Sequence, residues 1–209
     1  MPINLNILAD VIDIRNDIPQ KSDIFLVDTN VWFWRTYANA GFNAKPAQRQ
    51  KRRNYFNYLN LALLNGATLT YSGLTLAELA HIIEKTEYEI YVQSNGYLPI
   101  KEYRHNYPTE RANVVAEVQF TWRRIKKIAI PIDLTVDDST TDAALKRFQT
   151  QAVDGYDLLL LEAISRAGAG TVKIITDDLD YSVVPGIQIF TSNSYVIQEA
   201  TKQKKLIVR

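Results

Sequence analysis

Short apolar runs alternate with longer amphipathic stretches along the chain. The runs at residues 24–27, 67–71, 128–132, 172–176 and 187–190 have the length and composition of strands. Between them, the spacing of apolar side chains predicts helices at 30–34, 46–65, 74–93, 110–127, 138–148 and 156–167. Strands that alternate with helices are typical of βαβ units, so the pattern predicts an α/β fold around a mostly parallel sheet.

The length of 209 residues suits one domain, or one domain with a sizeable insertion. Residues 1–23 are expected to form an N-terminal extension, and residues 24–209 the main domain. An insertion of helix and loop is expected around 94–127. Within it, Gly96, Pro99 and Pro108 predict a loop at 94–109.

Composition excludes several classes of function. The chain has no cysteine, which excludes disulfides, thiol nucleophiles and zinc–thiolate sites. The longest apolar stretch, 158–161, is too short to span a membrane, and residues 1–23 do not resemble a signal peptide, so a cytoplasmic protein is expected. The net charge of +1 provides no long-range attraction for nucleic acid, so RNA would have to bind to local basic patches.

Acidic residues fall where predicted strands end and helices begin. Asp28 directly follows the first predicted strand, and Glu78 lies early in the helix after the second. Asp178 and Asp180 follow the run at 172–176. Because the carboxyl ends of parallel strands lie at one edge of a sheet, several of these acids are expected to converge there.

Asp157 interrupts an otherwise apolar predicted helix. It precedes four leucines, and Asp154 lies three residues earlier, on the same helical face. A buried, unpaired carboxylate is costly, and two close ones raise each other's pKa. A divalent cation removes this conflict, and Mg²⁺ prefers oxygen ligands.

Each acid also has a structural interpretation. Asp28 could cap the following helix, and Glu78 could complete a capping box with Thr75. The acids at 177–180 could form a solvated turn. The combination is much less probable by chance than any one of its members.

Four segments, in order, resemble the motifs of PIN-domain nucleases. They are Val-Asp-Thr-Asn-Val at 27–31, Thr-Leu-Ala-Glu-Leu at 75–79, Tyr-Asp-Leu-Leu-Leu-Leu-Glu-Ala at 156–163 and Thr-Asp-Asp-Leu-Asp-Tyr at 176–181. The resemblance spans about residues 24–190. It implies a three-layer α/β/α sandwich and a metal-dependent ribonuclease, with VapC-like toxins and their antitoxin partners among its relatives.

Carried over by motif, the resemblance implies Mg²⁺ or Mn²⁺ as cofactor. The metal-site and catalytic acids would be Asp28, Glu78, Asp157 and Asp178. Asp180 would be an accessory ligand, and Asn30 and Thr176 would support the site through hydrogen bonds. Whether Asp154 joins the site is open, and the length of the chain puts the toxin role in more doubt than the nuclease chemistry.

The best candidate for an RNA-binding surface is a run of basic side chains on one predicted helix. These residues are Arg49, Lys51, Arg52 and Arg53. The aromatic run 32–34 is expected in the core or in a contact with a partner, and a homodimer is one such contact. The main rival is a PIN-like scaffold that binds RNA or protein without cutting, and a Mg²⁺-dependent phosphatase is a third interpretation.

Overall fold

The computed structural model describes residues 3–166 and 171–209. Seven strands of these residues form one sheet in the order β4-β3-β2-β5-β6-β1-β7, and every pairing is parallel. The strands are β1 (Asp10–Asp13), β2 (Ile24–Val27), β3 (Thr68–Tyr71), β4 (Ile130–Pro131), β5 (Val172–Ile175), β6 (Ile187–Thr191) and β7 (Leu206–Ile207).

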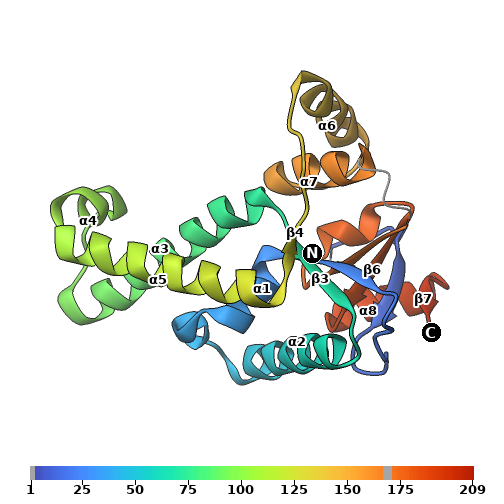
Figure 1. Ribbon diagram of the computed structural model, residues 1–209, viewed down its shortest axis with the longest axis horizontal. Coiled ribbons are helices and arrows are strands. Elements are labelled where there is room, and N and C mark those ends of the chain that lie inside the picture. Colours follow the sequence, from blue (N-terminus) through green and yellow to red (C-terminus); the bar gives the residue numbers. More distant parts are fainter. Residues whose placement is uncertain (1–2, 167–170) are drawn as a thin grey trace.

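Helices cover both faces of the sheet (Figure 1). One face packs against α1 (Thr29–Thr36), α2 (Pro46–Leu64), α3 (Gly73–Asn95) and α5 (Pro108–Ile128). The other packs against α6 (Asp138–Thr150), α7 (Gly155–Arg166) and α8 (Ser194–Lys202). The predicted α/β/α sandwich around a parallel sheet is therefore confirmed.

Strand β2 shows why the sheet is buried on both sides. Phe25 and Val27 point into the core beneath α1 and α2, whereas Leu26 points into the core beneath α7 and α8. All three are almost fully buried. A strand covered on both faces needs apolar residues on both of its sides, and Phe25, Leu26 and Val27 satisfy this requirement, whereas Ile24 at the start of the strand is exposed.

Residues 1–23 contribute a strand to the sheet. Strand β1 lies between β6 and β7, with Asp10 opposite Gln188. Leu5, Ile7 and Val11 are buried in the core on the face of the sheet that α8 covers. Strands β1 and β7 and helix α8 were not predicted. The two strands are short and pair with segments that are distant in sequence, whereas the buried residues of α8, Val196, Ile197 and Ala200, follow a helical spacing that is visible in the sequence.

The segment expected as an insertion is almost entirely helical. Residues 94–109 contain helix α4 (Ile100–Asn106), so the loop predicted there is shorter than expected. Figure 1 shows α4, and the ends of α3 and α5 near it, projecting away from the sheet. The buried carboxylate of Glu84 ties the three helices together, accepting hydrogen bonds from Arg104 at 2.7 Å and from Arg111 at 3.1 Å.

The remaining differences lie at element ends. Strand β4 covers two of the five residues predicted at 128–132. Two short 3₁₀ helices, η1 (Ala38–Gly41) and η2 (Asp180–Val183), follow α1 and β5. The predicted helix at 156–167 corresponds to α7, and its last residue lies outside the described residues.

Candidate active site

Asp28 and Thr176 follow two neighbouring strands at the centre of the sheet. Val27 of β2 pairs with Ile175 of β5, so the next residues lie beside each other. The Thr176 hydroxyl donates a hydrogen bond of 2.8 Å to Asp28 Oδ2. The chain continues from β2 to β3 on one side and from β5 to β6 on the other, which makes this a topological switch point where α/β proteins form crevices.

The capping interpretation of Asp28 is wrong. Asp28 is the N-cap residue of α1, but its side chain makes no capping hydrogen bond. Its side chain is 6% exposed and its backbone amide extends the ladder to Ile175 O. The carboxylate is therefore buried at the carboxyl ends of β2 and β5.

Glu78 reaches the same end of the sheet from α3. Its capping interpretation is also wrong, because α3 begins at Gly73 and is capped by Ser72 together with Thr75. Glu78 is thus one turn inside the helix and half-buried. The Thr29 hydroxyl, next to Asp28 in sequence, donates a hydrogen bond to Glu78 Oε2.

Asp157 enters from the opposite helical layer. It lies in the first turn of α7 and is 8% exposed, and the buried hydroxyl of Tyr181 donates a hydrogen bond to its Oδ1. Glu162 points elsewhere, as predicted, and pairs with Arg147. Asp154 is exposed and precedes α7 instead of sharing a helical face with Asp157.

Asp178 and Asp180 occupy the turn after β5. The Asp178 amide donates a hydrogen bond to Thr176 Oγ1 at 2.9 Å, and Asp178 Oδ1 accepts one from the Asp180 amide at 2.9 Å. The turn is therefore locked by its own side chains, and both acids are partly buried. Asn30 makes no side-chain hydrogen bond to another described residue, so its supporting role stays a prediction.

The acids raise one another's pKa. Burial raises the pKa of Asp28 to about 7, and the charges of Asp178 and Glu78 add to this effect. Burial and the charge of Asp28 raise the pKa of Asp157 to about 8.

The pKa values of the neighbouring acids Glu78 and Asp180 are raised in the same way. Burial and the charges of Asp154 and Asp178 raise the pKa of Glu78. The pKa of Asp180 is raised by burial, by Asp178 and by Asp154. These couplings bring Asp28, Glu78, Asp157 and Asp178 into one electrostatic group, which we call the carboxylate cluster, with Asp154 and Asp180 at its rim.

The cluster has no cationic partner in the part of the chain that is described. No Lys, Arg or His side chain of residues 3–165 and 171–209 forms an ion pair with its four acids. Over the same residues, no three acidic or histidine side chains are already arranged to hold a metal ion. The chemistry of the donors fits Mg²⁺ or Mn²⁺, and metal binding would need the carboxylates to close together.

Tyr55 of α2 supports the cluster and carried no signal in the sequence. Its hydroxyl donates to Thr176 O at 2.8 Å and lies 3.1 Å from Asp177 Oδ1, and it accepts from the Ser192 amide at 3.0 Å. It thereby ties α2 to the ends of β5 and β6. No role in the site was predicted for Thr29 or Tyr181 either, although both lie inside the motifs that resemble PIN-domain nucleases.

The basic residues of α2 differ in their surroundings. Arg53 is exposed, and Arg49 donates to Ala44 O at 2.9 Å. Lys51 pairs with Asp177 at 2.9 Å. Arg52 lines a hollow of about 330 Å³ beside Lys51 and Asp177. Of the aromatic run, Trp32 and Phe33 are in the core as expected, and Trp34 lines this hollow.

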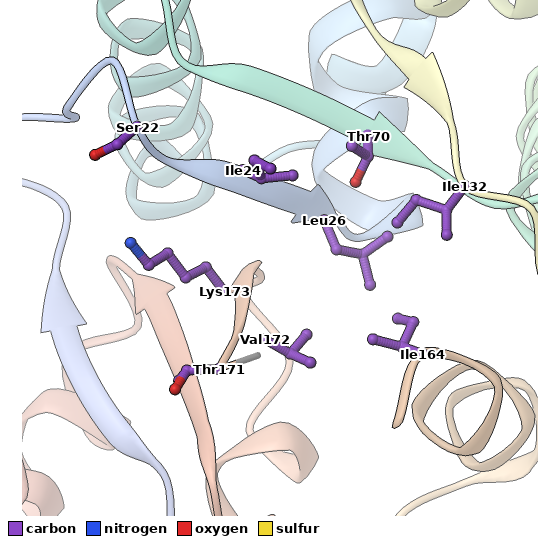
Figure 2. A pocket seen from close by; sticks show the side chains of 9 residues that line it. All are labelled: Ser22, Ile24, Leu26, Thr70, Ile132, Ile164, Thr171, Val172 and Lys173. Atoms are coloured by element: carbon purple, nitrogen blue, oxygen red, sulfur yellow. The ribbon is translucent and has the colours of Figure 1, made fainter. Parts of the chain in front are cut away.

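A second hollow, of about 180 Å³, lies on the sheet face toward α7 (Figure 2). Figure 2 shows Ile24, Leu26, Ile132, Ile164 and Val172 among the side chains around it. It contains no carboxylate, so it is distinct from the cluster.

Neither a protein-family model nor a curated protein matches this sequence. Among solved structures, the chain is similar to one in the crystal structure of VapBC2 from Rickettsia felis bound to a DNA fragment from their promoter. The two are 15% identical with a TM-score of 0.45, and the match covers 79% of this chain and 96% of the other. In the described residues, every helix is too short or too polar to cross a membrane.

Proposed function

We propose that this protein is a metal-dependent endoribonuclease that hydrolyses RNA phosphodiester bonds at the carboxylate cluster. The observation that carries the proposal is the gathering of Asp28, Glu78, Asp157 and Asp178 at the switch point of the sheet without a cationic partner among the described residues. Such a group is unstable as four anions and is suited to binding a divalent cation.

Hydrogen bonds prepare the cluster for a cation. Thr176 holds one oxygen of Asp28, Thr29 holds one of Glu78, and Tyr181 holds one of Asp157. Each bond holds one carboxylate oxygen, and the second oxygen accepts no side-chain hydrogen bond from a described residue, so it is available to a ligand. Mg²⁺ or Mn²⁺, when bound, supplies an activated water and stabilises charge on the leaving oxygen.

The choice of RNA as substrate rests on the four motifs that resemble PIN-domain nucleases and on the basic face of α2. That face lies next to the cluster, because Lys51 contacts Asp177, the neighbour of Asp178. An RNA strand bound along this basic face would extend to the acids of the cluster.

The test is cleavage of a labelled RNA pool with Mn²⁺, Mg²⁺ or EDTA, using wild type, Asp28→Asn and Glu89→Gln. Glu89 is an exposed acid of α3 outside the cluster and serves as the matched control. We expect metal-dependent cleavage by wild type and the control, and none by Asp28→Asn. Folded wild type that cuts no RNA with either metal would favour the non-cutting scaffold, and release of phosphate from phosphate esters alone would favour the phosphatase.

The toxin role is a finer part of the proposal. A toxin should arrest growth when expressed without its antitoxin, and Asp28→Asn should abolish the arrest. Normal growth with active, folded wild-type protein would leave a ribonuclease of another role.

A further inference from the structure

The hollow beside Asp177 is walled by four chain segments. Trp34 comes from α1, Phe42 follows η1, Gln48, Lys51 and Arg52 come from α2, and Asp177 follows β5. Its volume is about 330 Å³. Since Asp177 directly precedes Asp178, the hollow opens beside the carboxylate cluster.

The two basic side chains of the hollow, Lys51 and Arg52, differ in whether they have an acidic partner. Lys51 is neutralised by Asp177, with Nζ 2.9 Å from Oδ2. Arg52 has a buried Nε with no hydrogen-bond partner, and its guanidinium forms no ion pair with a described residue. Burial and the charge of Arg49 lower the pKa of Arg52. A half-buried guanidinium without an acceptor is costly, so the hollow favours an anion.

The hollow is also shaped around this guanidinium. A Cβ at Gly41 would lie 2.5 Å from Arg52 Nη1, so only the absence of a side chain there leaves the guanidinium its place. Trp34 and Phe42 provide an apolar wall, and Trp34 is held by Tyr55, with ring centroids 5.5 Å apart.

These features match one nucleotide. A guanidinium fork binds phosphate with two parallel hydrogen bonds, and an aromatic wall stacks on a base of any sequence. The volume is near the lower end of sites for small organic ligands, which start at about 300 Å³. Lys51 has a separate effect, because its pairing with Asp177 removes a negative charge that would repel the phosphate.

We propose that this hollow holds one nucleotide of a single-stranded RNA, adjacent to the bond that is cut. The phosphate binds Arg52 and the base packs against Trp34. The inference rests on the proposed function, since it takes the strand onward to the carboxylate cluster, but it concerns binding and can be tested without cleavage.

The experiment measures binding of a labelled random 12-nucleotide RNA by fluorescence anisotropy, in EDTA and at several salt concentrations. Arg52→Gln is compared with Arg123→Gln, an identical charge change at an exposed residue of α5 outside the basic face of α2. We expect Arg52→Gln to weaken binding about 10-fold and to reduce the salt slope by about 0.7, the value of one phosphate contact on a single strand. Arg123→Gln should weaken binding less than about 2-fold.

A second variant keeps the charge. Gly41→Ala should displace the guanidinium and weaken binding, with circular dichroism unchanged. RNA should also quench wild-type tryptophan fluorescence, and Trp34→Phe should remove most of the quenching.

Equal weakening by Arg52→Gln and Arg123→Gln, or unchanged binding in Arg52→Gln, would overturn the inference. Arg52-dependent binding by a wild-type protein that cuts no RNA would support this subsite and refute the nuclease. Cleavage that is retained with no Arg52 effect on binding would support the nuclease and refute the subsite.

Discussion

Two buried aspartates flank the same strand and meet opposite surroundings. Asp23 precedes β2 and is 1% exposed, and Asp28 follows it and is 6% exposed. Asp23 accepts hydrogen bonds from Lys173, from Arg209 at 3.0 Å and from the Gln20 amide at 2.7 Å. Asp28 interacts electrostatically with three other acids, and it accepts hydrogen bonds from the Thr176 hydroxyl and the Thr29 amide, neither of which is a cation.

The difference appears in their protonation. Burial alone would raise the pKa of Asp23, but the hydrogen bonds from Arg209 and Lys173 outweigh burial and lower it. At Asp28 the hydrogen bonds from Thr176 and from the Thr29 amide lower the pKa, but burial and the charges of Asp178 and Glu78 outweigh them, and the pKa rises to about 7. Both residues are almost fully buried, so low exposure alone does not separate the two acids. The charged groups around each of them do.

The sharpest test exchanges each aspartate for asparagine. If RNA is cleaved at the cluster as we propose, Asp28→Asn should slow cleavage roughly 1,000-fold, because Asp28 would then be a central metal ligand whose loss removes several kcal/mol of stabilisation of the transition state. Asp23→Asn should keep wild-type activity per folded molecule, measured by single-turnover cleavage below its melting temperature. Equal losses in both variants would erase the comparison.

The second test removes Arg209, a cation that pairs with the acids before β2. Arg209 contacts both Asp17 and Asp23, with Nε 2.9 Å from Asp17 Oδ1. Arg209→Met should cost about 3–5 kcal/mol of stability, since it leaves the buried Asp17 without a cation and Asp23 with Lys173 alone. A drop in Tm of roughly 10 °C is then expected by calorimetry. The surface change Arg53→Met is the control and should shift Tm little.

The third test uses pH, where the two acids act with opposite sign. The Asp28 pKa is raised from 3.8 to about 7, so its contribution to stability is present below pH 4 and lost as the pH rises through 7. In EDTA, Asp28→Asn should therefore be more stable than wild type at pH 8, by about 2–4 kcal/mol, and nearly equal at pH 4.

Asp23 has a lowered pKa, so its stabilisation is present above pH 4 and lost as the pH falls below it. Asp23→Asn should be less stable than wild type at pH 8. Urea denaturation of the three proteins at both pH values checks the signs. A wild type that is more stable than Asp28→Asn at pH 8 in EDTA would show that the cluster is already compensated.

The smallest expected effect is at Tyr181, which is buried and donates to Asp157. Tyr181→Phe should slow cleavage about 10-fold by releasing a metal-site acid and cost about 1–2 kcal/mol of stability. Exposed Tyr97→Phe is the control. Unchanged cleavage with lowered stability would make Tyr181 purely structural.

Much of the molecule could be predicted from local pattern. Strands such as Ile24–Val27 are apolar throughout because both of their faces are covered, and Gly66 ends α2 because its φ of 77° suits glycine. The acids at strand ends could be predicted to converge, since parallel strands share one edge. Strand β1 could not be predicted, because its partners lie about 180 residues away.

By itself, the sequence determined the α/β class, the strands at the centre of the sheet and the set of acids at their ends. Only the tertiary structure decided which buried acids are compensated. Asp23 and Asp28 are five positions apart, and the sequence around them does not show which of the two is paired with a cation. The cations that pair with Asp23 belong to Lys173 and Arg209, which are distant in sequence and which the fold brings to this end of the strand. At the other end, no cation of the described side chains pairs with Asp28. Electrostatic pairing depends on distance in space, which folding sets and sequence spacing does not.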